Sequence, residues 1–168
     1  MDLSKLIAQE FKRRVFDESF VRIEKCLQML SDDEIWTKPN DQTNSIGNLV
    51  LHLMGNARQY IISGLGGEKD ERKRNLEFQM SSRCSTEELR SKMKSLKVEL
   101  TEVINGLTHE QLTSTFRVQG FEEKGINIAI HVIEHFSYHV GQIALYTKLI
   151  KNKDLGFYAG LDLDAKSN

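Results

Sequence analysis

Residues 126–150 read INIAIHVIEHFSYHVGQIALYTKLI, and this stretch decides the fold. As one helix it would be roughly 37 Å long at about 1.5 Å per residue, enough to cross a small domain. Only Glu134 and Lys148 carry full charge in it, so we expect a buried helix packed against neighbours around its circumference. Isoleucines alternate at its start, which also indicates a strand, but the alternation fails past Val132 and the segment is too long for one strand. Its ionisable side chains argue against a membrane span.

The same stretch carries His131, His135 and His139 at every fourth position. Histidines on the buried face of a helix need partners, because an unsatisfied polar group in a core is costly. Two interpretations follow from the residues alone. The imidazoles form a hydrogen-bonded network with nearby polar groups, or some of them hold a metal ion.

Length and composition describe an ordinary soluble chain that forms a single domain over residues 1–168. Hydrophobic residues make up 39% and charged residues 28%, and the net charge of −1 gives no argument for nucleic acid as a partner. The first residues include acidic side chains and no apolar core of a signal peptide, so we expect no secretory signal. The two cysteines, Cys26 and Cys84, form no CxxC pair. A reduced, cytoplasmic protein fits these features best.

Three further helices are predicted around the histidine stretch. Apolar residues at steps of three and four predict a helix from about Leu3 to Leu30, and another from Ser45 to the glycines after residue 63. Ser85 and Glu88 form a capping-box pattern at the start of the third, which ends near Leu107. The predicted fold is therefore all-α, a four-helix bundle.

The polar stretch 66–84 separates the second and third of these helices. It carries many charges of both signs and no periodicity, so we interpret its charges as a solvated loop. A loop this long is uncommon in a compact domain unless it crosses the domain or carries function. A crossover would let the second and third helices run parallel. Residues 113–120 predict a short extended piece, and the tail after residue 153 is expected to fold back over one end of the bundle.

Helical spacing restricts which histidines can share one ion. Residues four apart lie on one face with Cβ atoms about 6 Å apart, whereas His131 and His139 are about 12 Å apart along the axis. The converging pair is therefore 131/135 or 135/139. The second helix has its midpoint near His52, and antiparallel packing of the midpoints favours His135 and His139 opposite His52. Three neutral imidazoles leave a position open, as in catalytic zinc sites, and nickel also accepts three nitrogens.

Polar residues one turn from these histidines are candidates to orient the imidazole rings. They are Asn48, Asn56 and Gln142. Glu134 is a poor candidate for a general base, because it points about 100° away from His135 on the helix. We expect Glu134 to pair with a basic residue elsewhere.

Residues 44–61 (NSIGNLVLHLMGNARQYI) and 131–150 (HVIEHFSYHVGQIALYTKLI) resemble the DinB-like superfamily of bacterial four-helix-bundle proteins, which includes YfiT-related proteins. The closing LGFYAGL is similar to tails in a branch of undefined function. The resemblance implies an up-down-down-up bundle, frequent homodimers, and a divalent ion, nickel or zinc, bound by His52, His135 and His139. His131 then becomes a neighbour of the site.

Two function classes follow from the resemblance. Some relatives transfer a low-molecular-weight thiol to an electrophile with the help of the metal, which predicts a metal-dependent S-transferase acting on a small-molecule substrate. The alternative is a metal-binding stress or accessory protein without catalysis. No motif in the sequence matches a thiol-binding site.

Overall fold

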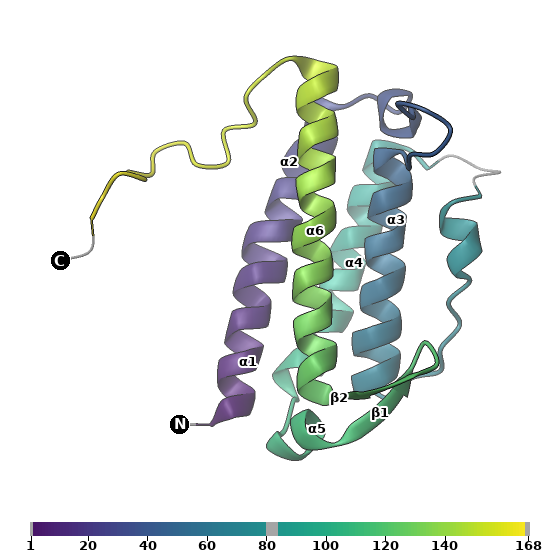
Figure 1. The fold of residues 1–168 in the computed structure, drawn as a ribbon, viewed down its shortest axis with the longest axis vertical. Helices are drawn as coiled ribbons and strands as arrows, with labels where there is room; N and C mark the ends of the chain where they lie inside the picture. The colour runs from purple at the N-terminus through teal and green to yellow at the C-terminus, as the bar shows by residue number, and fades with distance from the viewer. Residues whose placement is uncertain (1, 80–83, 167–168) are drawn as a thin grey trace.

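Four long helical segments lie side by side in the computed structural model, which describes residues 2–79 and 84–166 (Figure 1). The first is continuous through a stretch of π-helix, and the second also ends in π-helix. In chain order they are α1 (Leu3–Phe11), η1 (Lys12–Phe20) and α2 (Val21–Met29); α3 (Ile46–Ala57) and η3 (Arg58–Leu65); α4 (Thr86–Asn105); and α6 (Gly125–Lys151). The expectation of a mostly helical protein is confirmed, with one small sheet in addition.

Helix boundaries follow from local side-chain capping. Ser45 and Asn48 form a reciprocal capping box at the start of α3, and Ser85 and Glu88 do the same for α4. The capping box at Ser85 and the helix start at Ser45 were predicted from the sequence and are confirmed, whereas the role of Asn48 in the first box was not predicted. At its other end α6 stops at Asn152, which adopts a left-handed conformation with φ of 47°.

The short elements lie at the ends of the long segments. They are η2 (Glu34–Trp36), η4 (Arg74–Glu77), α5 (His109–Thr113), β1 (Thr115–Val118) and β2 (Phe121–Lys124). The extended piece expected within 113–120 is present as β1, but it pairs antiparallel with β2, which the pattern did not predict. Gln119 and Gly120 both have positive φ, as a tight two-residue hairpin requires. The hydroxyl of Tyr60 donates to Gln119 Oε1 at 2.9 Å and ties this turn to η3.

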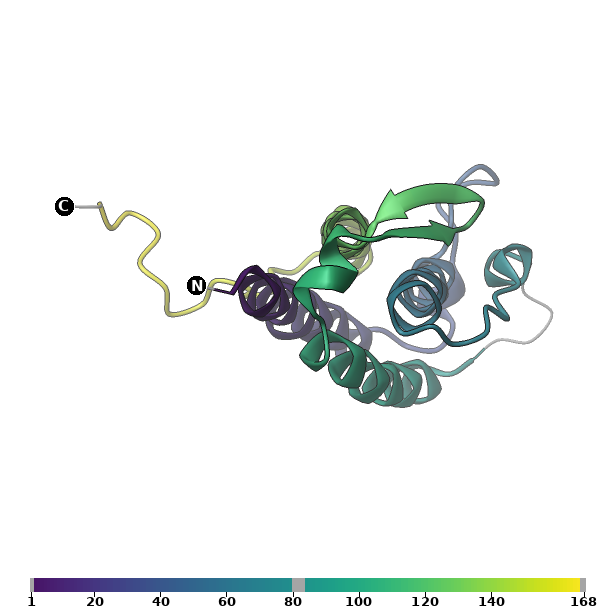
Figure 2. The ribbon, with the colours of Figure 1, turned by 90° about the horizontal axis from the view of Figure 1, so that it is seen from below.

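The core lies between the long segments, with α6 contacting the first segment along one side and α3 and η3 along the other (Figure 2). Helix α4 packs against these same two segments. The expectation that α6 is buried around its whole circumference is wrong. Tyr138, Leu145 and Leu149 are 65%, 55% and 69% exposed, because α6 borders solvent along one face. No helix in the described residues is both long and apolar enough to cross a membrane.

The tail only partly follows its prediction. Leu155 is buried, and Lys25 Nζ donates to the carbonyl oxygen of Gly156 at 2.9 Å. The rings of Phe157 and Tyr158 then contact Arg22, and the rest of the tail runs away from the helices without covering an end of them (Figure 1). Residues 167 and 168 lie outside the described residues.

Trp36 packs flat against the start of α3 at Gly47. A Cβ at Gly47 would lie 2.5 Å from atom Cζ3 of the Trp36 ring. The ring is held in place because its Nε1 donates to the carbonyl oxygen of Cys84 at 2.9 Å. The Gly47→Ala variant should therefore lose about 1–3 kcal/mol of unfolding free energy through overpacking. Urea denaturation followed by the fluorescence of the sole tryptophan measures this loss.

Gly141→Ala is a control variant whose expected effect on the unfolding free energy has the opposite sign. A Cβ there meets nothing within 4 Å, and the position is exposed in the interior of α6. Gly141→Ala should raise the unfolding free energy by roughly 0.5–1 kcal/mol through helix propensity. Equal effects of the two variants would contradict the packing described for Trp36.

Candidate metal centre

Three histidines from two neighbouring helices meet in one cluster, here called the histidine triad. His52 comes from α3, and His135 and His139 come from successive turns of α6. One nitrogen from each lies within 4.8 Å of the other two, and Nε2 of His52 is 2.9 Å from Nε2 of His135. His52 and His139 are 6% and 9% exposed, and His135 is half-buried. Of the two pairs left open by helical spacing, the structure brings 135/139 together with His52.

Hydrogen bonds on the far side of two rings fix their orientation. Nδ1 of His52 lies 2.8 Å from the Glu77 carboxylate, and Nδ1 of His139 lies 2.7 Å from Oε1 of Gln142. Oxygen acceptors at these distances place the ring proton on Nδ1 in both histidines. The Nε2 lone pairs are then left to face the middle of the triad, as in proteins whose metal-binding histidines donate their other N–H to an oxygen.

Burial and neighbouring groups set the pKa of two of the three triad histidines. Burial, followed by the charges of His139 and His52, lowers the pKa of His135 from its ordinary value to about 3. Burial also lowers the pKa of His139, against an opposing effect of its bond to Gln142. Metal binding requires neutral imidazoles, because a protonated ring has no lone pair to donate. Both rings therefore meet this requirement at pH 7.

The triad fits a divalent metal ion on its own chemistry. Tetrahedral zinc with bonds of about 2.0–2.1 Å to imidazole nitrogens needs ligand atoms roughly 3.4 Å apart. The spacing within the triad is compatible with this after a small opening of the contact between His52 and His135. Without an ion, the facing Nε2 atoms of His52 and His135 must share a single proton. A metal ion between them would accept a lone pair from each.

A buried ion pair behind His52 was missed by the sequence analysis. Arg72 donates to both carboxylate oxygens of Glu77, through Nε at 2.7 Å and Nη2 at 2.9 Å, and the two side chains are only 4% and 10% exposed. Burial alone would raise the pKa of Glu77, but the hydrogen bonds from His52 and Arg72 outweigh burial and hold the pKa below its ordinary value. The interpretation of 66–84 as a solvated loop is therefore wrong for these two residues.

Several contacts hold this segment against α3 and η3. The side-chain amide of Asn48 donates to the backbone carbonyl of Glu77 at 2.9 Å, and Arg72 Nη1 donates to Oε1 of Gln59 at 2.8 Å. Gly55 is needed for the close approach, because a Cβ there would overlap Glu77 Oε1. Asn48 thus acts on Glu77 and forms no hydrogen bond with an imidazole among the described residues. Residues 80–83 of the segment lie outside the described residues.

His131 lies beside the triad, one turn before His135. Its ring stacks on His135 with centroids 5.4 Å apart and on Tyr60 at 4.2 Å. Asn56 Nδ2 is 3.2 Å from His131 Nε2, so Asn56 supports His131 and contacts no triad member by hydrogen bond in the described residues. Glu134 is exposed. The expectation that Glu134 pairs with a basic residue is wrong within the described chain, where it forms no ion pair.

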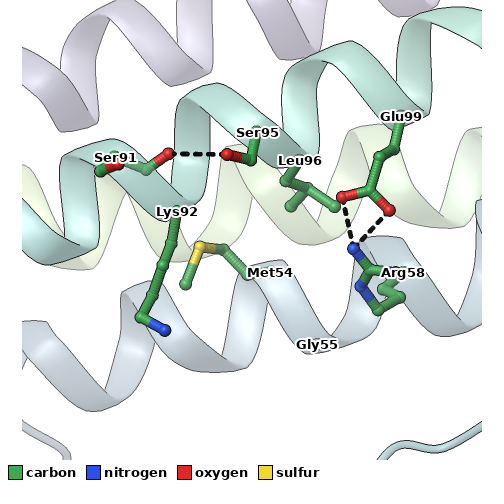
Figure 3. Close-up of a pocket in the computed structure, with 8 residues that line it drawn as sticks. All are labelled: Met54, Gly55, Arg58, Ser91, Lys92, Ser95, Leu96 and Glu99. Atoms are coloured by element: carbon green, nitrogen blue, oxygen red, sulfur yellow. Dashed lines mark hydrogen bonds and ion pairs between the residues drawn. The ribbon is translucent and has the colours of Figure 1, made fainter.

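A separate cavity lies between the second segment and α4 (Figure 3). Arg58 and Glu99 form an ion pair at its edge, and Lys92 extends beside Met54. None of the three histidines lines this cavity.

Comparison with known proteins identifies the fold. A family model described as "Protein of unknown function (DUF1572)" matches residues 5–159. Among solved structures, a DinB-like protein of Bacillus subtilis, YjoA, is 17% identical with a TM-score of 0.66, covering 89% of this chain and 94% of that chain. A DinB-like protein of Bacillus cereus is 16% identical with a TM-score of 0.66, covering 85% and 92%. A conserved protein of Enterococcus faecalis is 14% identical with a TM-score of 0.68, covering 91% and 99%.

At these identities the likeness shows the fold alone. The resemblance to DinB-like proteins drawn from the sequence is confirmed at that level. The expected branch of undefined function agrees with the description of the matching family. No curated protein matches the chain.

Proposed function

This chain belongs to the DUF1572 family of proteins of unknown function, and from that premise we propose that it binds one divalent metal ion through His52, His135 and His139. The observation that carries the proposal is the convergence of three imidazole nitrogens within 4.8 Å. Zinc and nickel both suit three nitrogen ligands with an open position.

Other residues of the chain would hold the ligands in place. Glu77 orients His52, Arg72 keeps the Glu77 carboxylate ionised, and Gln142 orients His139. Asn48 anchors Glu77, while Asn56 and His131 form the adjoining wall. Such outer residues typically change metal affinity about 10–100-fold when they are replaced.

We propose further that the protein transfers a low-molecular-weight thiol to an electrophilic substrate. A divalent ion in the triad would supply a Lewis acid that lowers the pKa of a thiol in its open position. In the transfer, a sulfur–carbon bond forms and the bond to the leaving group breaks. The leaving group takes the electron pair, and the thiol proton goes to solvent.

Thiol transfer is favoured over hydrolysis because the triad lacks a free general base in the described residues. Glu77 is engaged by Arg72 and by the outer nitrogen of His52, and Glu134 lies on the exposed side of α6. Hydrolysis usually needs such a base for the protons of water. Cys26 is 1% exposed and burial raises the pKa of its thiol, so the nucleophile should come from a small molecule.

A metal-binding role without catalysis is the alternative. It is favoured by the cover over His52, which is contacted by Glu77 and Arg72 and has the ring of Phe78 at 5.0 Å between centroids.

We also infer an up-down-down-up four-helix bundle that forms a cytoplasmic homodimer. The course of the ribbon in Figure 1 supports the bundle, since the segments before and after the long 66–84 connection descend and the first and last ascend. The exposed apolar side chains of Tyr138, Leu145 and Leu149 on α6 support self-association. Sedimentation velocity at micromolar concentration should give a dimer, and a monomer would contradict this part of the proposal.

Metal content tests the ligand assignment. The purified protein should hold one zinc or nickel ion per chain, and His135→Ala should hold none while keeping its helix content. His131→Ala is the matched control on the same helix and should keep the ion. Glu77→Gln should weaken affinity about 10–100-fold. Elemental analysis with circular dichroism measures these outcomes, and full occupancy in the His135 variant would refute the assignment.

Conjugation assays test the chemistry. The metal-loaded protein should couple bacillithiol or a similar thiol to a model electrophile, and His139→Ala should lose this rate. A rate that persists after metal removal would contradict metal-dependent transfer. The absence of any metal-dependent rate across a broad panel of thiols and electrophiles would favour the non-catalytic role.

A further inference from the structure

Asn56 carries the one buried side-chain nitrogen or oxygen without a hydrogen-bond partner in the described part of the chain. Its side chain is 3% exposed, and its Oδ1 accepts no hydrogen bond from a described residue. Burying an acceptor without a donor costs free energy, because the hydrogen bonds that water made to it are lost. This oxygen therefore needs a donor, and the surroundings of Asn56 indicate where that donor lies.

Asn56 lies one helical turn from the histidine triad on both of the helices that build it. On α3 it follows His52 by four residues, and its partner on α6, His131, precedes His135 by four residues. Two successive contacts between the helices result. In one, Nε2 of His52 is 2.9 Å from Nε2 of His135, and in the next, Nδ2 of Asn56 is 3.2 Å from Nε2 of His131. Four residues rise about 6 Å along a helix, which is the separation of the two contacts.

The contact with His131 leaves Oδ1 as the free atom of the Asn56 amide. An amide nitrogen only donates, so Nδ2 donates to the lone pair on Nε2 of His131. Tyr60 closes the side away from the triad, because it lies one turn beyond Asn56, is 5% exposed, and stacks its ring on His131 at 4.2 Å. A donor for Oδ1 is therefore expected from the side of the triad.

The charges beside the triad favour a neutral donor. Arg72 donates to both carboxylate oxygens of Glu77 and to Oε1 of Gln59. The Glu77 carboxylate is thus already balanced and does not compensate an ammonium group bound at Asn56. Because a buried charge without a partner is costly, a neutral N–H group suits this acceptor better than an ammonium group.

We propose that Oδ1 of Asn56 accepts a hydrogen bond from an amide N–H of the thiol that the metal centre binds. The inference rests on the proposed function, because it takes the thiol sulfur to lie at the triad. A sulfur and an amide nitrogen separated by two carbon atoms, with a hydrogen bond of about 2.9 Å, span the distance of one helical turn. Asn56 then selects low-molecular-weight thiols whose amide nitrogen lies two carbons from the sulfur.

Two thiols that differ at one position test the proposal. N-Acetylcysteamine carries an amide N–H two carbons from its sulfur, and 2-mercaptoethyl acetate has an ester oxygen in its place. Binding to the cobalt-loaded protein is followed by sulfur-to-cobalt charge-transfer absorption. The amide should bind about 10-fold more tightly than the ester, because the ester offers no donor to the buried acceptor. Equal affinities would overturn the inference while leaving the metal centre intact.

Matched variants assign the preference to Asn56. Asn56→Leu removes the acceptor with little change in side-chain volume and should bring the ratio of amide to ester affinity close to one. Asn127→Leu makes the same change at an exposed position of α6 and should leave the ratio near its original value. A purely structural role of Asn56 would change both affinities together, so an unchanged ratio in Asn56→Leu would contradict the proposal. Circular dichroism and cobalt content check that each variant is folded and loaded.

Carbon NMR of the unaltered protein detects the hydrogen bond itself. In the zinc-loaded protein the Cγ signal of Asn56 should move downfield when N-acetylcysteamine is added, and the ester should not move it. A stationary signal while the amide binds would overturn the inference. If cobalt fills the triad and no thiol gives charge-transfer absorption, the thiol part of the proposed function fails, and this inference fails with it.

Discussion

The hydrogen bond between Nδ1 of His52 and the Glu77 carboxylate is the contact on which the histidine triad depends. It joins α3 to a segment 25 residues later in the chain, at 2.8 Å, in a place where both side chains are at most 10% exposed. A carboxylate buried there needs compensation, and Arg72 supplies it through two further hydrogen bonds. Gly55 makes room for the carboxylate, and Asn48 fixes its backbone. The result is a histidine whose inner nitrogen carries a lone pair toward α6.

The geometry of α6 completes the arrangement. A repeat of four residues puts His131, His135 and His139 along one face, but only two of them reach the ring of His52 at the point where the helices meet. The third extends the row of stacked rings to Tyr60.

Periodicity and capping made much of the fold predictable. The long apolar runs and the capping boxes at Ser45 and Ser85 are local signals, and they agree with the helices observed. The meeting of His135 and His139 with His52 followed from helical spacing and from matching helix midpoints. The roles of Arg72 and Glu77 could not be predicted this way. Both lie in a polar stretch, and its sequence would be the same whether the two side chains were buried as an ion pair or exposed to solvent. The exposed face of α6 was also hidden, since an apolar side chain does not reveal whether a neighbour covers it.

The central claim is that the triad holds a metal ion between its inner nitrogens. Crystals of the protein grown with zinc, with diffraction data collected on both sides of the zinc absorption edge, test it most directly. The account predicts one anomalous density peak per chain, about 2.0–2.1 Å from Nε2 of His52, His135 and His139. A peak elsewhere, or zinc-loaded crystals with no peak at the triad, would contradict it.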